Sequence, residues 1–217
     1  MRSDAMTVDP ALDIEALAWD KQDGLLPAIV QDAQTHRVLM LGYMDRDALA
    51  ATLASGYATF YSRSRARLWR KGESSGHGLR VVSLQADCDA DTLLLQALPE
   101  GPTCHLGRRS CFVDAPGDFF AELDGIVAQR ERERPAGSYS TKLFEAGLRR
   151  IAQKVGEEGV ETALAAVAQD DEALLGEAAD LLYHLTVLLR ARGLSVGGAV
   201  RRLESRHRPE TGGGGVG

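Results

Sequence analysis

The hydrophobic and polar positions follow one pattern in the first half of the chain and a different pattern in the second. Residues 25–114 contain short apolar runs separated by polar turns, the pattern of β-strands. From Phe119 onward, apolar residues recur at the three- and four-residue spacing of helices. The change falls near Ala115–Gly117, where Pro and Gly interrupt both patterns. We therefore predict a strand-rich α+β domain over residues 10–115 and an all-α domain over residues 118–208.

Local signals predict individual elements in the first domain. The expected strands are residues 26–30, 38–41, 59–62, 81–84 and 92–95. The first two flank the polar turn 32–37, which predicts a hairpin. Asp45 is a good N-cap for a short helix through Ala54, and Gly56 ends that helix.

The second domain is predicted to consist of helices only. The first begins near Phe119 and ends before Pro135–Ser138, which breaks the pattern. The predicted helices that follow are residues 140–168, 172–191 and 196–206. Residues 209–217 are too rich in Gly to order themselves, so we expect a flexible tail there.

The composition fits a globular protein and narrows the possible partners. The 217 residues are 44% hydrophobic and 26% charged, which is ordinary for a soluble protein. The net charge of −6 argues against general nucleic-acid binding, and no apolar run approaches the ~20 residues of a membrane helix. An N-terminus without a long apolar stretch, together with three cysteines, fits the reducing cytoplasm.

The three cysteines, Cys88, Cys104 and Cys111, lie close together in the sequence and predict a zinc site. Three thiols cannot complete a four-thiolate structural site, but they can hold zinc and leave the fourth position to water, as in catalytic sites. The alternative is that they are small buried apolar residues. Because Cys104 and Cys111 lie in a polar, turn-rich segment, we favour zinc. His105 could be a base, a partner of a ligand or a surface residue.

Asp87, Asp89 and Asp91 alternate around Cys88. On an extended segment the three carboxylates would share one side, opposite Cys88, and could form a magnesium site. The alternative is a solvated strand end.

Residues 62–77 concentrate cations, hydroxyls and glycines, and five of the nine residues from 63 to 71 are basic. We favour a clamp for a phosphorylated small molecule over a nucleic-acid patch, because the chain as a whole is acidic.

Charged residues of the second domain gather into narrow stripes. On a helical wheel, Lys154, Glu157, Glu158 and Glu161 fall within an arc of about 100°. On the next helix, Glu177, Asp180 and His184 share one face. Surface helices often carry such charges. Here the rest of each helix is unusually apolar, so we predict facing carboxylates that require cations, and hard oxygen ligands suit Mg²⁺.

Residues 138–207 resemble phosphoribosyl-ATP pyrophosphohydrolase, one of the all-α (MazG-like) nucleotide pyrophosphatases. The motifs that carry the resemblance are Ser138–Leu143, Gln153–Glu161 and Glu177–His184. The resemblance implies a helical bundle and magnesium-assisted attack of water on a triphosphate. It implies that Glu158, Glu161, Glu177 and Asp180 hold Mg²⁺ and that Lys142 and Lys154 contact substrate. Glu157 would add a ligand or accept a proton.

Residues 19–114 resemble phosphoribosyl-AMP cyclohydrolase. The motifs are Ser62–Arg65, Leu68–His77, Asp87–Asp91 and Cys104–Phe112. The resemblance implies a homodimer in which Cys88 of one chain meets Cys104 and Cys111 of the other at zinc, and Asp87, Asp89 and Asp91 as the magnesium site. The implied substrate contacts are Arg63, Ser64, Arg65, Trp69, Lys71 and Ser75, with His77 or His105 handling the proton.

The two resemblances in tandem predict a bifunctional hydrolase of histidine biosynthesis with zinc and magnesium. The second domain would release pyrophosphate from phosphoribosyl-ATP, and the first would open the adenine ring of the product. One competing hypothesis is a house-cleaning nucleotide pyrophosphatase fused to an unrelated zinc domain. Another is a non-catalytic metal-binding or nucleic-acid-binding module.

Overall fold

The chain folds into two compact units, which a computed structural model describes over residues 6–9 and 12–207. The boundary between the units falls between Asp118 and Phe119, next to the predicted change of pattern. The first unit is strand-rich and the second is all-helical, which confirms the predicted fold class. The predicted tail, 209–217, lies outside the described residues, as do the predicted domain ends at residues 10 and 208.

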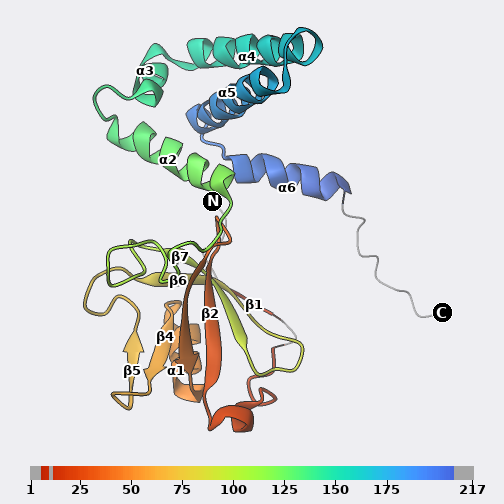
Figure 1. The fold of residues 1–217 in the computed structure, drawn as a ribbon. Coiled ribbons are helices and arrows are strands. Elements are labelled where there is room, and N and C mark those ends of the chain that lie inside the picture. Colours follow the sequence, from red (N-terminus) through yellow and green to blue (C-terminus); the bar gives the residue numbers. More distant parts are fainter. Residues whose placement is uncertain (1–5, 10–11, 208–217) are drawn as a thin grey trace, which may run out of the picture. The chain divides into compact units, whose positions relative to one another are not determined.

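The first unit is built on a five-stranded mixed sheet with a separate two-stranded hairpin (Figure 1). Its elements are β1 (Thr7–Val8), the 3₁₀ helix η1 (Trp19–Gln22), β2 (Leu26–Asp32), β3 (Val38–Met44), α1 (Arg46–Ser55), β4 (Thr59–Ser62), β5 (Arg67–Arg70), β6 (Leu79–Ala86) and β7 (Leu93–Pro99). The strand order of the sheet is β1-β6-β7-β2-β3. β2 pairs antiparallel with β3 and parallel with β7, and β4 pairs with β5 alone. β3 is therefore an edge strand.

The predicted hairpin and the predicted helix of this unit are confirmed. β2 and β3 pair from Leu26 with Met44 to Gln31 with Val38. The side chain of Asp45 accepts the Ala48 amide as the N-cap of α1, and Gly56 ends the helix in the left-handed region with φ 74°. β1, η1 and β5 were not predicted, because two of them are very short and β5 begins and ends with Arg.

The core of this unit lies between the sheet and α1. Alternate residues of β2 and β7 are fully buried, and Ala48 and Leu49 of α1 belong to the same buried cluster. Such alternation buries one face of each strand, so the sequence pattern alone sets which side chains form the core.

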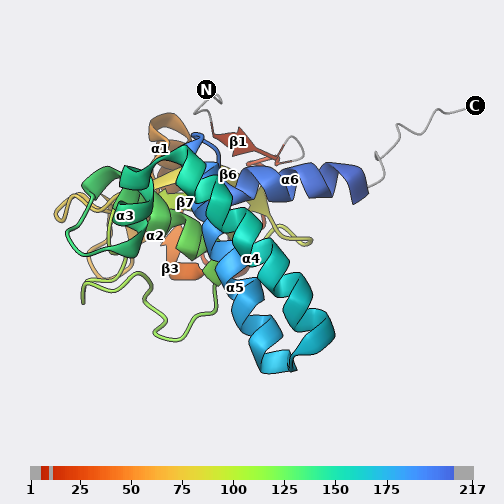
Figure 2. The same ribbon diagram turned by 90° about the horizontal axis from the view of Figure 1, so that it is seen from above.

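Over its described residues, 119–207, the second unit consists of five helices, α2 (Phe119–Glu133), α3 (Tyr139–Ala146), α4 (Leu148–Ala168), α5 (Asp171–Ala191) and α6 (Val196–His207). α4 and α5 run side by side as a helical hairpin in both ribbon views (Figures 1 and 2). The prediction of one helix over 140–168 is wrong. Gly147 has φ 83° and its amide bonds back to Leu143 and Phe144, so α3 ends there and α4 starts anew.

The second unit has a small buried core, made by Val127, Leu143, Ile151 and Val187. A buried carboxylate, Asp124 of α2, accepts hydrogen bonds from Arg190 of α5. Apolar residues on the outer faces of α4 and α5 remain open, and Val167 is 82% exposed. No helix among the described residues is long and apolar enough to cross a membrane.

Candidate active sites

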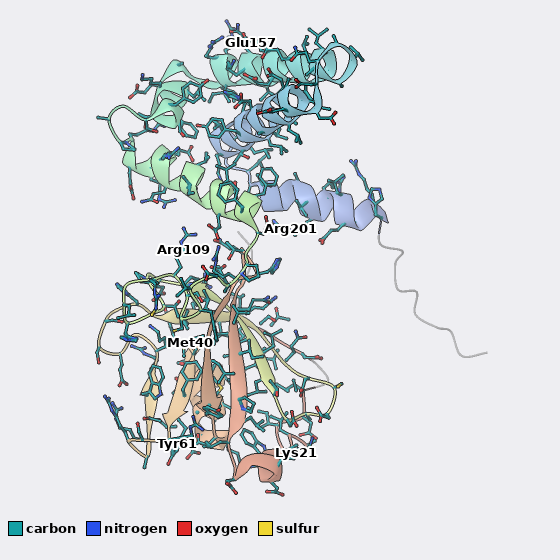
Figure 3. All side chains as sticks on the ribbon, viewed as in Figure 1. Lys21, Met40, Tyr61, Arg109, Glu157 and Arg201 are labelled. Atoms are coloured by element: carbon teal, nitrogen blue, oxygen red, sulfur yellow. The ribbon has the colours of Figure 1, made fainter. Side chains whose placement is uncertain are left out.

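A pocket of about 730 Å³ in the first unit brings together most of the predicted substrate residues. It is bounded by the β4–β5 hairpin, the loop after β5 and the cysteine loop after β7. Met40 of β3, labelled in Figure 3, also lines it. The predicted site residues that line it are Ser64, Arg65, Trp69, Lys71, Ser75, His77, Cys104, His105 and Cys111. Arg63 does not line the pocket, and its guanidinium instead lies 3.8 Å from the ring centre of Tyr43.

The loop that carries Cys104 and Cys111 is fixed at both ends. The Cys104 amide bonds to the Arg108 carbonyl and Gly107 turns with φ 76°, which makes a tight turn after the first cysteine. The Cys111 amide donates to the Leu39 carbonyl at 2.8 Å, and Ser110 Oγ donates to Val38 O at 2.7 Å. The loop is thus held against the outer edge of β3.

The two thiols of this loop fit a zinc ion. A hydrogen bond from the Leu106 amide lowers the pKa of Cys104, so the thiolate that binds metal is favoured. Burial raises the pKa of Cys111, and Cys104, which lines the same pocket, raises it further. Burial lowers the pKa of Lys71, and the charges of Cys111 and Cys104 oppose that shift.

Cys88 does not join these two thiols within one chain. It is exposed and does not line the pocket. Among the described residues, two groups of three or more side chains could share a metal ion, and neither contains a cysteine. One chain therefore presents two thiols at one place and the third elsewhere.

The aspartates around Cys88 lie in a turn and not on the extended segment that the sequence analysis considered. Asp87 Oδ1 accepts the amides of Asp91 and Thr92 at 3.0 Å each, and Ala90 has φ 59°. The turn still gathers one carboxylate oxygen each from Asp87, Asp89 and Asp91 within 4.8 Å of one another.

A lysine that sequence reasoning missed offsets part of the negative charge of this turn. Lys21 on η1 (Figure 3) places its ammonium 2.7 Å from Asp89 and 3.0 Å from Asp91. These hydrogen bonds raise the pKa of Lys21, and the bond from Lys21 lowers the pKa of Asp89. The turn can therefore exist without a metal, and an entering cation would have to displace Lys21.

His77 packs closely against two glycines, whose missing side chains leave room for it at the pocket. A Cβ on Gly101 would lie 2.7 Å from the His77 ring, and one on Gly72 would lie 2.6 Å from the His77 backbone. Lys71 Nζ also donates to the His77 carbonyl at 3.2 Å. The lysine and histidine are therefore held in contact with each other at the pocket wall.

In the second unit, three of the four predicted metal ligands converge. Oxygens of Glu158, Glu161 and Glu177 lie within 4.8 Å of one another, from the facing helices α4 and α5. Burial raises the pKa of Glu161, and the charges of Glu158 and Glu177 raise it further. Three carboxylates share one nearby cation, Lys154, so an excess of negative charge remains on hard oxygen donors, which fits Mg²⁺. Asp180 is exposed and lies outside this group of three.

Lys154 and Glu157 form an ion-pair network beside this cluster. Lys154 Nζ is 2.5 Å from Glu158 Oε1 and 3.0 Å from Glu157 Oε2. Arg150 and Gln153 also contact Glu157 (labelled in Figure 3), and the bond from Lys154 lowers its pKa. Because these cations and the amide stabilise its charged form, the Glu157 carboxylate is a weak base. The predicted substrate residue Lys142 is exposed on α3.

Behind the cluster lies a buried histidine whose role the sequence did not reveal. His184 Nδ1 is 2.9 Å from the Asp180 carbonyl and 3.6 Å from Glu158 Oε1, and its Nε2 is 3.0 Å from the Tyr139 hydroxyl. The helical spacing of Glu177, Asp180 and His184 correctly predicted that His184 shares a face with the two carboxylates. Nothing in the sequence pointed to Tyr139 as its hydrogen-bond partner.

The fold and both sites define a two-domain hydrolase, and comparisons with known proteins agree. Residues 40–113 match the family model described as phosphoribosyl-AMP cyclohydrolase. Residues 120–207 match the model described as phosphoribosyl-ATP pyrophosphohydrolase.

Relatives that match this chain over nearly their full length share one name. A "Histidine biosynthesis bifunctional protein HisIE" from Xanthomonas axonopodis pv. citri is 69% identical, over 94% of this chain and 98% of the relative. Proteins of the same name from Xylella fastidiosa and Shewanella oneidensis are 67% and 53% identical, over 96% and 90% of this chain and 100% and 93% of their own lengths.

The chain belongs to the HisIE family of bifunctional histidine-biosynthesis enzymes. It is a multifunctional hydrolase with a cyclohydrolase domain followed by a pyrophosphohydrolase domain, as predicted. The alternative of a house-cleaning pyrophosphatase fused to an unrelated zinc domain is not favoured, since both halves match the same pathway.

Proposed function

We propose that the helical domain acts first, converting phosphoribosyl-ATP and water to phosphoribosyl-AMP and pyrophosphate. The first domain then adds water across the N1–C6 bond of the adenine ring and opens it. The observation that carries this proposal is the presence of two chemically distinct sites. One is a pocket with adjacent thiols and basic lining, and the other is a three-carboxylate cluster beside a lysine.

In the pocket, Arg65, Lys71 and Ser75 bind the phosphate groups, and Trp69 offers a ring face to the base. Ser64 lies beside Arg65 and contributes a hydroxyl, and Arg63 would join at the rim. His77 or His105 moves the proton, because both line the pocket with the thiols.

Zinc in this pocket would be held by Cys104 and Cys111 together with the partner subunit's Cys88, in a homodimer. The support is that Cys104 and Cys111 line the same pocket while Cys88 lies outside it. When bound, zinc would activate water for attack on C6.

Mixing two inactive variants tests this shared site. Cys88→Ala and Cys104→Ala chains should each fail to open the ring but still release pyrophosphate. In a twofold dimer, co-refolding equal amounts should restore about a quarter of wild-type ring opening, because half of the dimers regain one complete site. If all three ligands belonged to one chain, the mixture would remain inactive. Metal analysis should find about one zinc per chain of wild type.

In the helical domain, we propose that Glu158, Glu161 and Glu177 hold Mg²⁺ and that Asp180 joins when substrate binds. Lys154 and Lys142 bind phosphate oxygens, and the ion pairs of Glu157 favour a role in orienting Lys154. When bound, Mg²⁺ would neutralise the developing charge of the pyrophosphate that leaves.

Glu161→Gln tests this role, because it removes one charge at nearly constant shape. Pyrophosphate release should be lost while ring opening continues. Metal-free stability should be unchanged or slightly higher, since repulsion with Glu158 and Glu177 falls. Retained turnover would reject the metal role. A large loss of metal-free stability would mean that Glu161 is a structural partner.

We further propose that the aspartate turn binds Mg²⁺ in exchange for Lys21, and that the enzyme works in the cytoplasm. The free thiols of the described chain require reducing conditions if they are to bind metal rather than oxidise. The two domains are proposed to span residues 10–115 and 118–208. Expressing each separately and assaying its own reaction would test those limits.

A further inference from the structure

Two neighbouring hydrogen bonds join the start of α3 to α5. Tyr139 bonds through its hydroxyl to His184 Nε2 at 3.0 Å, and Ser140 Oγ bonds to the Tyr183 hydroxyl at 2.7 Å. Consecutive residues of one helix thus contact consecutive residues of the other. Only the first of these bonds continues to the carboxylate cluster, because His184 lies against Glu158.

Both nitrogens of His184 are committed to fixed partners. The Asp180 carbonyl, 2.9 Å from Nδ1, can only accept, so Nδ1 carries the proton and donates. In the neutral tautomer, Nε2 has a free lone pair and accepts from the Tyr139 hydroxyl. Rotation of the imidazole would break both bonds, and the burial of the ring, at 4% exposure, makes their replacement by solvent costly.

The fixed ring in turn limits where the Glu158 carboxylate can lie. Glu158 is also 4% exposed, and its Oε1 has Lys154 Nζ at 2.5 Å and His184 Nδ1 at 3.6 Å. Glu158 is the buried member of the three-carboxylate cluster, so its position sets the geometry that Glu161 and Glu177 complete.

We propose that Tyr139 and His184 are positioning residues for pyrophosphate release. Tyr139 fixes the His184 ring, and the ring fixes Glu158 in the cluster; neither needs to touch the substrate. This inference rests on the proposed magnesium role of the helical carboxylates.

Tyr139→Phe tests the inference, and Tyr183→Phe is its matched control. Each removes one phenol hydroxyl that joins α3 to α5, and Tyr139 is 49% exposed, so Phe fits there. In the full-length zinc-loaded enzyme, Tyr139→Phe should lower kcat for pyrophosphate release about tenfold and raise the half-saturating Mg²⁺ concentration, as for other residues that orient metal ligands. KM for phosphoribosyl-ATP and the rate of ring opening should stay near wild type. Tyr183→Phe should lower the melting temperature but leave kcat and the Mg²⁺ dependence unchanged.

Calorimetric binding of Mn²⁺ gives a readout independent of turnover. The binding that Glu161→Gln eliminates should be several-fold weaker in Tyr139→Phe and unchanged in Tyr183→Phe. Because Tyr139 acts through His184, adding Tyr139→Phe to His184→Gln should cause no further loss.

Equal effects of Tyr139→Phe and Tyr183→Phe on kcat and Mn²⁺ binding, or additive losses in the double variant, would overturn the inference. If Glu161→Gln is inactive but Tyr139→Phe is normal, the positioning role alone fails. If Glu161→Gln still releases pyrophosphate, the magnesium proposal itself fails.

Discussion

Replacing Asp124 with Ala should destabilise the helical unit far more than the strand-rich unit. The Asp124 carboxylate, 7% exposed on α2, accepts from Nε of Arg190 at 2.8 Å and more closely from Nη2. It is also 3.5 Å from the Val196 amide at the start of α6. One carboxylate therefore connects α2, α5 and α6.

The size of the effect follows from what remains after the change. Breaking a buried ion pair typically costs about 3–5 kcal/mol, because the surviving charge is left without a partner. The Arg190 side chain is 25% exposed, so water can solvate part of it and we expect about 2–3 kcal/mol. For a unit of this size each kcal/mol lowers the melting temperature by about 4–8 °C, which gives a fall of roughly 10–20 °C.

The two activities report on the two units in a single sample. After brief heating, pyrophosphate release by Asp124→Ala should disappear at a temperature roughly 10–20 °C below wild type. Ring opening should be lost at the wild-type temperature. Glu133→Ala, at an exposed position of the same helix, is the control and should change stability by less than about 0.5 kcal/mol.

A shift of less than about 4 °C would refute the energetic reasoning, since it corresponds to under 1 kcal/mol. An equal shift of both activities would instead refute the expectation that the units unfold separately.

Three further substitutions test particular placements in the first unit. Gly101→Ala would push a Cβ into the His77 imidazole, so the rate of adenine-ring opening should fall roughly 10- to 100-fold while pyrophosphate release continues. A normal rate of adenine-ring opening would contradict the role of His77. Lys21→Gln removes the ammonium that competes with a metal ion for Asp89 and Asp91. Calorimetry should show Mn²⁺ binding to the aspartate turn about three- to tenfold more tightly, and equal affinity would show that Lys21 does not compete. Gly42→Ala would overlap the Phe60 ring and should destabilise the first unit by about 1–3 kcal/mol in a thermal melt, and an unchanged melt would show that the ring can move aside.

Much of the fold was predictable because its signals are local. The β2–β3 hairpin depends on alternating apolar residues around a polar turn, and α1 depends on a capping Asp and a terminal Gly. Gly147 was missed because the apolar spacing of α3 continues into α4, and only the backbone conformation reveals the break. β5 was missed because its strand character comes from pairing with β4 rather than from an apolar run.

The candidate sites were predictable only as far as residues close in sequence remain close in space. The carboxylates of α4 and α5 follow from helical periodicity plus one turn between the helices. The Lys21 contact with Asp89 joins residues 68 positions apart, and Tyr139 reaches His184 across 45 positions. No periodic pattern encodes such contacts, because they depend on how the elements pack.

The cysteine loop also shields the open edge of the sheet. β3 is an edge strand, and the bonds from Ser110 and Cys111 to the carbonyls of Val38 and Leu39 occupy part of its outer side. Unpaired edge strands can recruit strands of other molecules and so lead to aggregation. Any event that releases this loop, such as oxidation of its thiols, would expose the edge along with the loss of the site. Damage to catalysis and loss of solubility would then share one cause.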